Sequence, residues 1–216
     1  MIDLHSHILA GIDDGASTLE DSIALIEQSS AMGVEQILAT PHIQFGVYDN
    51  NLNSIQTAFD SLCSKLQSTH LDISVAFAAE LRICPEIMML AKMKQLPFMG
   101  KFQEQDVLLL EFPHSAIPPG SEKLIDWLIK QNIRPMIAHP ERNRDFAKFP
   151  QIMQQFKQRD CLWQLTAGSL LGDFGNLAET VVWKMVEEGD ATVVASDMHN
   201  ISKRPSKMKH AYDLVT

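Results

Sequence analysis

Short apolar runs alternate with longer amphipathic stretches along the whole sequence, and this alternation constrains the fold more than any other feature. The apolar runs are brief, rich in β-branched residues and almost continuous, as expected for strands that are buried on both faces. In order, they cover residues 2–5, 36–40, 73–78, 107–112, 135–138, 162–166 and 192–195. Seven such strands separated by helical stretches predict a parallel sheet with helical crossovers.

Helices are predicted between these strands from capping signals and from apolar residues at three- and four-residue spacing. The predicted helices cover residues 17–33, 53–68, 85–94, 121–131, 149–159, 177–188 and 205–214. The Ser-x-x-Glu pattern of Ser17 and Glu20 is typical of a capping box at the start of the first helix. A chain of 216 residues without an internal linker or repeat predicts one domain over residues 1–216. We expect an α/β fold with a closed or nearly closed (β/α) barrel, and an open doubly wound sheet is the alternative.

Composition narrows the functional classes. The hydrophobic share of 45% and the charged share of 21% are ordinary globular values and argue against disorder. A formal net charge of −9 argues against a nucleic-acid-binding surface, which is normally basic. The sequence has neither a secretory signal nor an apolar run of the ~18 residues that a membrane span needs, so we expect no membrane insertion. Three unclustered cysteines predict a reducing, cytoplasmic environment.

Residues of metal-ligand type stand at the carboxyl ends of the predicted strands. They are His5 and His7, His42, Glu80, Glu111, His139, and Asp197 with His199. Parallel barrels and α/β sheets place their chemistry at this end. A single His-x-His pattern would be weak evidence, but the recurrence after six of the seven predicted strands predicts a metal site.

Spacing supports this prediction. Residues i and i+2 of a strand share a face, so His5 and His7 should point the same way, and Asp197 and His199 repeat the pattern. Nitrogen and oxygen donors without cysteine suit Zn, Mn, Fe or Co. These donors exceed what one ion needs, so we expect carboxylates to bridge two or three ions.

Several longer segments resemble the polymerase and histidinol phosphatase (PHP) superfamily of metallophosphoesterases. Within that superfamily, the sequence is similar to the bacterial tyrosine phosphatases of capsular and exopolysaccharide assembly. The segments that carry the resemblance are Asp3-Leu4-His5-Ser6-His7, Gly11-Ile12-Asp13-Asp14-Gly15-Ala16, Thr40-Pro41-His42, Glu80-Leu81-Arg82-Ile83, Leu110-Glu111-Phe112-Pro113, His139-Pro140-Glu141-Arg142-Asn143, Thr166-Ala167-Gly168-Ser169-Leu170 and Ser196-Asp197-Met198-His199-Asn200 with Arg204-Pro205. They follow one another in the family's order over essentially the whole chain.

The resemblance implies a distorted (β/α)7 TIM-like barrel (the PHP fold) with three divalent ions, manganese first and Fe, Zn or Co as alternatives. By position, His5, His7, Glu80 and Asp197 correspond to the ligands of one ion. Glu80 would bridge to a second ion shared with Glu111 and His139. Asp14, His42 and His199 correspond to the third set, with Asp13 as the competitor of Asp14. Arg142 and Arg204 resemble the family's phosphate-contacting, catalytic arginines.

The resemblance also implies a function. We expect a metal-dependent protein-tyrosine phosphatase that acts on the phosphotyrosine-containing tail of a membrane-associated tyrosine autokinase. A small-molecule phosphomonoesterase, such as one for histidinol phosphate, is the alternative, followed by a catalytically silent metal-binding scaffold. The resemblance is compatible with an oligomeric protein.

Two departures from the family pattern are visible. Ala78 and Ala79 precede Glu80 where relatives more often have Gly and Gln, and relatives usually continue beyond the position of Thr216. Outside the strand-end pattern, His70 and His210 are predicted to be exposed surface residues, whereas His114 is close enough to be a second-sphere or substrate residue.

Other phosphatase chemistries lack their motifs. A cysteine-dependent tyrosine phosphatase needs Arg six residues after the nucleophilic Cys. The residues six beyond Cys63, Cys84 and Cys161 are Thr69, Leu90 and Ala167. The sequence also has no Gly-x-Ser-x-Gly elbow and no Gly-Lys-Ser/Thr phosphate loop.

Overall fold

The structure, a computed structural model, describes residues 1–216 and contains two compact units. Unit 1 comprises Met1–Glu80, Thr166–Gly168 and Val194–Thr216. Unit 2 comprises Leu81–Leu165 and Ser169–Val193.

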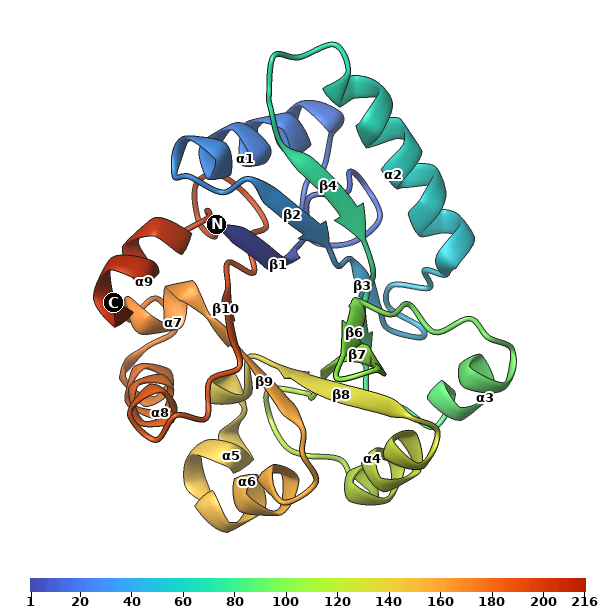
Figure 1. The fold of residues 1–216 in the computed structure, drawn as a ribbon, viewed down its shortest axis with the longest axis vertical. Coiled ribbons are helices and arrows are strands. Elements are labelled where there is room, and N and C mark those ends of the chain that lie inside the picture. Colours follow the sequence, from blue (N-terminus) through green and yellow to red (C-terminus); the bar gives the residue numbers. More distant parts are fainter. The chain divides into compact units, whose positions relative to one another are not determined.

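Unit 1 is built on a parallel sheet of three strands (Figure 1). Strands β1 (Ile2–Ser6), β2 (Gln36–Ala39) and β4 (Ser74–Phe77) follow in the order β1-β2-β4. The remaining elements of this unit are β3 (His42–Ile43), α1 (Leu19–Ala31), α2 (Leu52–Leu66), α9 (Met208–Val215) and most of β10 (Val193–Ala195). A parallel bridge between Ser6 and Met198 brings the segment after β10 beside the carboxyl end of β1.

Local sequence explains where the helices of unit 1 begin. The capping box of α1 uses Thr18 and Asp21, so the prediction that Ser17 and Glu20 form it was wrong by one residue. Thr18 accepts from the Asp21 amide while Asp21 accepts from the Thr18 amide, which satisfies two donors at the helix start. Asn51 caps α2 in the same way with Ser54.

Unit 2 contains four parallel strands in the order β9-β8-β7-β5, and β6 pairs antiparallel with β7 (Figure 1). The strands are β5 (Glu80–Arg82), β6 (Gly100–Phe102), β7 (Gln105–Glu111), β8 (Ile133–Ala138) and β9 (Leu162–Thr166). The helices are α3 (Ile87–Lys92), α4 (Ser121–Lys130), the 3₁₀ helix η1 (Pro140–Arg142), α5 (Arg144–Lys148), α6 (Pro150–Lys157), α7 (Ala167–Leu170) and α8 (Asn176–Glu187).

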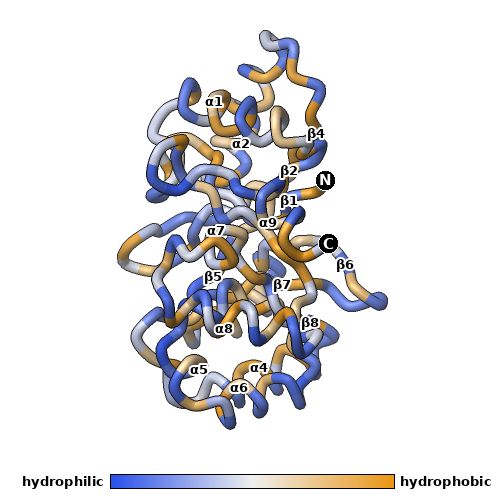
Figure 2. Tube along the Cα trace, turned by 90° about the vertical axis from the view of Figure 1, so that its left-hand side faces the viewer, coloured by the Kyte–Doolittle hydropathy of each residue, from blue (hydrophilic) through white to orange (hydrophobic).

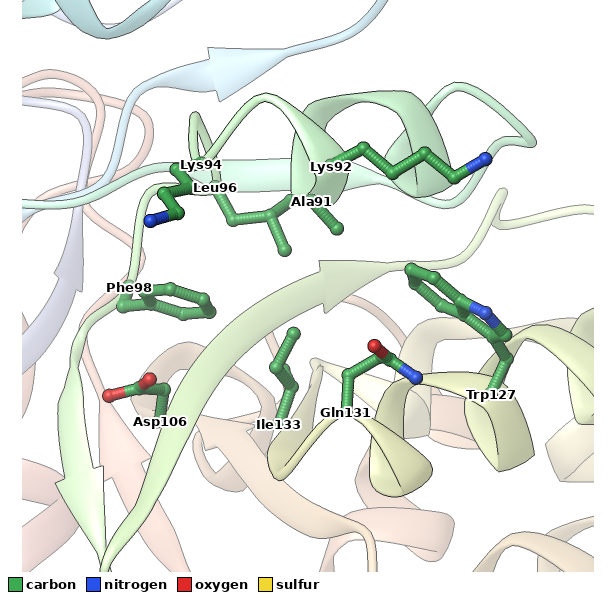
Figure 3. Close-up of a pocket in the computed structure, with 9 residues that line it drawn as sticks. All are labelled: Ala91, Lys92, Lys94, Leu96, Phe98, Asp106, Trp127, Gln131 and Ile133. Carbon is green, nitrogen blue, oxygen red and sulfur yellow. The ribbon is translucent and has the colours of Figure 1, made fainter.

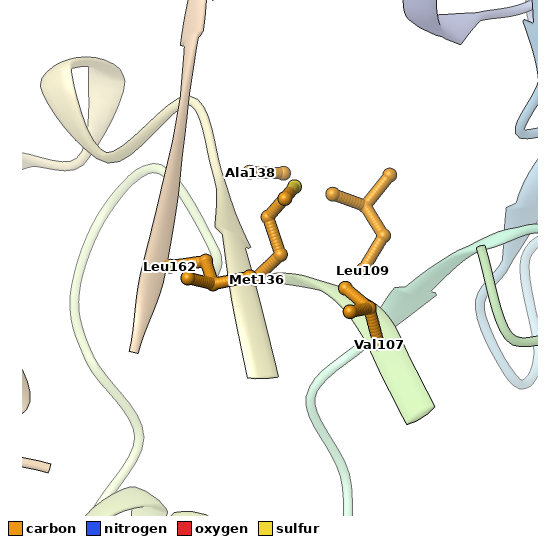
Figure 4. Close-up of a cluster of buried hydrophobic side chains, with 5 residues drawn as sticks. All are labelled: Val107, Leu109, Met136, Ala138 and Leu162. Carbon is orange, nitrogen blue, oxygen red and sulfur yellow. The ribbon is translucent and has the colours of Figure 1, made fainter. Parts of the chain in front are cut away.

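Alternate residues of the central strands form an apolar core in unit 2. Figure 4 shows Val107 and Leu109 of β7 beside Met136 and Ala138 of β8 and Leu162 of β9. The two-residue period of a strand places these side chains on one face of the sheet. Hydrophobic and hydrophilic residues alternate along α4 and α6 in Figure 2, as expected for helices with one buried face.

All seven predicted strands are present, and the prediction of an α/β fold with parallel sheets is confirmed. The sequence did not reveal the short strands β3, β5 and β6, nor the short helices η1, α5 and α7. Helix α6 corresponds to the predicted helix over 149–159. The longest helix has 15 residues, and no helix combines the length and hydropathy that crossing a membrane requires.

Candidate metal centre

A buried histidine pair at the end of β1 forms the centre of a polar cluster in unit 1. His5 and His7 are both fully buried, and their Nε2 atoms lie 3.2 Å apart. The pair faces one way because residues i and i+2 of a strand share a face. The predicted pairing of these two side chains is therefore confirmed.

Two carboxylates face this pair. Oε2 of Glu80 lies 3.4 Å from His5 Nε2 and 3.5 Å from His7 Nε2. Oδ1 of Asp197 lies 3.4 Å from each of the same two nitrogens. Two imidazole nitrogens and two carboxylate oxygens thus converge in a space closed to solvent, a donor set that fits a divalent cation.

A second group of donors adjoins the first. His7, Asp14, His42 and His199 each place one ligand atom within 4.8 Å of the others. Oδ1 of Asp14 lies 3.4 Å from Nε2 of both His42 and His199. Nδ1 of His42 lies 3.0 Å from Oε2 of Glu80, which connects the two groups.

Hydrogen bonds fix the orientation of the histidine rings. Nδ1 of His7 donates to Asp13 Oδ2 at 2.7 Å, and Nδ1 of His199 donates to the carbonyl of Asp197 at 3.0 Å. Both rings therefore present Nε2 to the cluster, the arrangement that second-sphere partners impose on metal-binding histidines. The Nε2 atom of His199 is buried and, although it lies 3.4 Å from Asp14 Oδ1, it makes no hydrogen bond. A buried nitrogen of this kind is suited to bind a metal ion.

The same contacts distinguish Asp14 from Asp13. The Asp13 carboxylate also accepts from the amides of Gly15 and His42, at 2.9 and 3.1 Å, so it is fully used in holding the loop. Gly15 is required there, because a Cβ atom would come within 2.1 Å of the His7 carbonyl oxygen. Asp14 is the half-exposed carboxylate that faces the histidines, which agrees with its predicted place among the ligands.

Burial and charge set the ionisation of the cluster. Burial lowers the pKa of His5 and His7, but nearby carboxylates outweigh it and raise both pKa values, mainly Glu80 for His5 and Asp13 for His7. Burial and then the neighbouring His7 lower the pKa of His199 to about 4, so its ring is neutral at pH 7. The histidines opposite Asp14 outweigh its partial burial and hold its pKa below the ordinary value. The raised pKa values of His5 and His7 reflect the negative charge of the carboxylates around them, and such carboxylates also favour a bound cation.

Asp197 is held in place by both backbone and side chain. Its φ of 51° lies in the left-handed region, which non-glycine residues adopt only when their surroundings require it. Its amide donates to the His5 carbonyl at 2.9 Å, and its Oδ2 accepts from Arg204 at 2.6 Å. Arg204, one of the two predicted phosphate-contacting arginines, is therefore tied directly to a candidate ligand.

Unit 2 contains a smaller cluster. Glu111, His114 and His139 each place one ligand atom within 4.8 Å of the others. Nε2 of His139 lies 4.0 Å from Oε1 of Glu111, and the His114 and His139 rings are 5.5 Å apart. Nη2 of Arg82 forms an ion pair with Oε2 of Glu111 at 2.9 Å. His139 has a φ of 31°, so like Asp197 it follows a strand in a left-handed conformation.

Arg142 lies between two side chains of unit 2. Its Nη2 donates to Nε2 of His114 at 3.2 Å, and its guanidinium carbon lies 4.3 Å from the centre of the Phe174 ring. The neighbouring Glu141 is buried and accepts from Ser169 Oγ at 2.7 Å. This hydrogen bond connects the His-Pro-Glu-Arg-Asn segment to the segment after β9.

The structure groups the predicted site residues by unit. Unit 1 contains His5, His7, Asp14, His42, Glu80, Asp197, His199 and Arg204, and unit 2 contains Glu111, His139 and Arg142. His70 and His210 are exposed, as predicted. Sequence reasoning missed Arg82, whose only local signal is its place two residues after Glu80. It also gave His114 too little weight, although the spacing of three residues from Glu111 was visible.

Comparison with known proteins gives one family. The family model described as capsular polysaccharide synthesis, CpsB/CapC, matches residues 1–216. The tyrosine-protein phosphatase YwqE of Bacillus subtilis is 35% identical over 205 residues, which cover 94% of this chain and 79% of YwqE. The tyrosine-protein phosphatase CpsB of Streptococcus agalactiae serotype III is 26% identical over 220 residues, covering 100% of this chain and 89% of CpsB.

Solved structures give the same result. One from a study of YwqE from Bacillus subtilis and CpsB from Streptococcus pneumoniae, described there as metal-dependent tyrosine phosphatases, matches with a TM-score of 0.89 at 33% identity. The match covers 99% of this chain and 86% of that one. The lactonase Lmo2620 of Listeria monocytogenes matches at a TM-score of 0.50 and 11% identity, over 100% of this chain and 84% of the lactonase, which is a likeness of fold alone. The resemblance inferred from the sequence segments is confirmed.

Proposed function

Because the chain belongs to the CpsB/CapC family of capsular polysaccharide synthesis proteins, we propose that it is a metal-dependent protein-tyrosine phosphatase. The observation that carries this proposal is the buried convergence of His5, His7, Glu80 and Asp197, with each carboxylate oxygen within 3.5 Å of both imidazole nitrogens. Buried donors of this kind are stable when they share a cation.

The donor clusters of both units would hold the ions, as the family resemblance implies. In this proposal three divalent ions, manganese first, are held by His5, His7, Asp14, His42, Glu80, Glu111, His139, Asp197 and His199. Glu80, the last residue of unit 1, is the proposed bridging carboxylate. When bound, such ions lower the pKa of water and neutralise charge on phosphoryl oxygens. We also propose, from the family resemblance, that the chain adopts the distorted (β/α)7 barrel of the PHP fold.

The arginines have the chemistry to bind the phosphate. A guanidinium group offers two parallel N–H donors that match two phosphate oxygens. Arg142 is partly exposed, and the Phe174 ring and His114 hold its guanidinium in place. Arg204 is 26% exposed at its side chain and is fixed by Asp197.

Three divalent ions would outweigh the four ligand carboxylates, so the site would be cationic although the chain carries a net charge of −9. A phosphotyrosine dianion would therefore be attracted. Its phenolate leaving group, with a pKa of about 10, needs less protonation than the alkoxide of a phosphoserine ester.

The finer assignments come from the family resemblance. We propose that the substrate is the phosphotyrosine-containing tail of a membrane-associated tyrosine autokinase and that hydrolysis takes place in the cytoplasm. The cytoplasmic assignment agrees with the cysteines, because Cys63, Cys84 and Cys161 are all free thiols.

A comparison of substrates tests the proposal. The protein is reconstituted with Mn²⁺ and assayed on a phosphotyrosine peptide, a phosphoserine peptide and histidinol phosphate, each with and without chelator. We expect chelator-sensitive hydrolysis with phosphotyrosine preferred. Preference for histidinol phosphate by orders of magnitude would instead identify a small-molecule phosphatase. Metal binding without any hydrolysis would identify a silent scaffold.

A further inference from the structure

A surface groove lies between α3 and α4 of unit 2. It consists of two hollows, of about 480 and 430 Å³, that share the side chain of Trp127. The first hollow has Ile83, Pro85 and Met88 on one side and Pro118 and Leu124 on the other. The second hollow is lined by Leu96 and Ile133, with Phe98 and Trp127 at its two ends (Figure 3).

The first hollow begins at the polar cluster of unit 2. The Ile83 amide donates to the carbonyl of Glu111 at 2.9 Å, and the preceding residue, Arg82, binds the Glu111 carboxylate. The opposite wall is the Pro118-Pro119 segment, four residues after His114 of the same cluster. One end of the groove is therefore set by the residues that hold Glu111.

The groove is apolar and adaptable. Met88, which lines the first hollow, is 37% exposed. Only Ile87 of α3 is buried, so this short helix presents most of its apolar surface outward. Exposed apolar surface of this kind marks binding sites, and methionine adapts its shape to different ligands.

The charges along the groove are mainly positive. Lys123 lines the first hollow and Lys92 and Lys94 line the second, whereas Asp106 is the one acidic residue that lines either. This basic lining stands out on a chain of net charge −9. It favours a ligand with carboxylates beside its apolar groups.

We propose that the α3–α4 groove binds the stretch of substrate polypeptide next to the phosphotyrosine, and that this stretch carries apolar and acidic side chains. The inference rests on the proposed function. A protein substrate continues beyond its reacting residue at about 3.3 Å per extended residue, so it needs a surface next to the site. A groove whose lining residue Ile83 donates to the Glu111 carbonyl provides that surface, whereas a small phosphate ester would not reach along it.

Two variants and one control test the groove. Met88→Glu removes an apolar contact in the first hollow, and Lys94→Glu reverses a charge in the second. Lys130→Glu makes the same charge reversal on α4 at an exposed position that lines neither hollow. Each is assayed on a phosphotyrosine peptide with flanking Leu and Asp residues, on a peptide of equal length with flanking Ser and Lys residues, and on p-nitrophenyl phosphate.

We expect Met88→Glu and Lys94→Glu to raise KM for the Leu/Asp peptide about 5- to 10-fold, the scale of one lost contact at a binding surface. Turnover of p-nitrophenyl phosphate, the thermal midpoint and all values for Lys130→Glu should stay at the wild-type level. Equal KM values for the two peptides, or an unchanged KM in both groove variants, would overturn the inference.

A second measurement separates this inference from the proposed function. Fluorescence anisotropy of the labelled Leu/Asp peptide reports binding without turnover. If no substrate is hydrolysed, the proposed function fails, yet the groove is still supported by binding that the two groove variants weaken. Sedimentation of a wild-type dimer that Met88→Glu dissociates would show that a second copy occupies the groove and would overturn the inference.

Discussion

Both units enclose apolar side chains, but the polar cluster buried in unit 1 is the larger. In unit 1, the end of β1 buries His5 and His7 against the carboxylates of Glu80 and Asp197. In unit 2, β7 and β8 bury aliphatic side chains such as Leu109 and Met136 (Figure 4). Apolar burial is favourable by itself, at about 25 cal/mol per Å², whereas buried charges are stable only when they are paired or bind an ion.

This difference assigns metal binding mainly to unit 1 and substrate recognition mainly to unit 2 of the proposed enzyme. Seven of the nine proposed ligands lie in unit 1, around the buried polar centre that we expect to need a cation. Unit 2 contains the other two proposed ligands, Arg142 and the α3–α4 groove, beside an apolar core. Metal binding and substrate recognition should therefore respond to different perturbations, and the following changes test that separation.

Removal of the metal should have the largest effect. Chelation should lower phosphotyrosine turnover by about 10³-fold or more, because bound ions supply several kcal/mol of transition-state stabilisation. The same treatment should increase amide hydrogen exchange in β1 and residues 194–199 and leave β7 and β8 protected. Hydrogen exchange with mass spectrometry measures both regions. Equal loss of protection in the two units would contradict the division.

Replacement of Arg142 by alanine should have the next largest effect. The loss of one charged donor to a phosphate commonly reduces kcat by about 10²- to 10³-fold. Metal content, measured by mass spectrometry of the bound metal, should be unchanged because Arg142 is not one of the proposed ligands and its guanidinium contacts His114 and Phe174. Full activity of Arg142→Ala would remove this arginine from the mechanism.

The sequence predicted the strands and most candidate ligands because their signals are local. Each strand is a short apolar run, and each ligand-type residue stands at its end, so the topology of a parallel sheet brings these residues to one edge. His5 and His7 needed only the two-residue period of a strand. Asp14 lies in a loop, and only the family resemblance identified it.

What the sequence missed depends on contacts between distant residues. The ion pair of Arg82 with Glu111 and that of Arg204 with Asp197 require backbone positions that no local pattern encodes. The left-handed conformations of His139 and Asp197 are also not evident from the sequence, because Asp and His are enriched in that region but most Asp and His residues lie outside it. Strands β3 and β5 have two and three residues, too few to produce a periodic signal.

Asp13→Asn should reduce metal affinity by about 10- to 100-fold, the usual effect of losing a second-sphere partner of a metal-binding histidine. Asp13 accepts from His7 Nδ1, and the loss of its charge weakens the hold on that ring. Asp21→Asn is the matched control, since it alters a carboxylate of the same unit that caps α1. Titration with Mn²⁺ measures the affinity, and equal values for both variants would show that Asp13 only shapes the loop.

Phe174→Leu should have the smallest effect and should fall on unit 2 alone. The ring lies 4.3 Å from the Arg142 guanidinium carbon, and leucine keeps the apolar volume while removing the π-face. An exposed cation–π contact contributes about 0.5–1 kcal/mol, so KM for phosphotyrosine should rise about 2- to 5-fold. Phe174→Tyr retains the ring and should restore the wild-type KM, which a loss of packing alone would not explain. Metal affinity should stay constant in both variants, because Phe174 is not one of the proposed ligands. A change in metal affinity with an unchanged KM would mean that the contact between Phe174 and Arg142 supports metal binding and not phosphate binding.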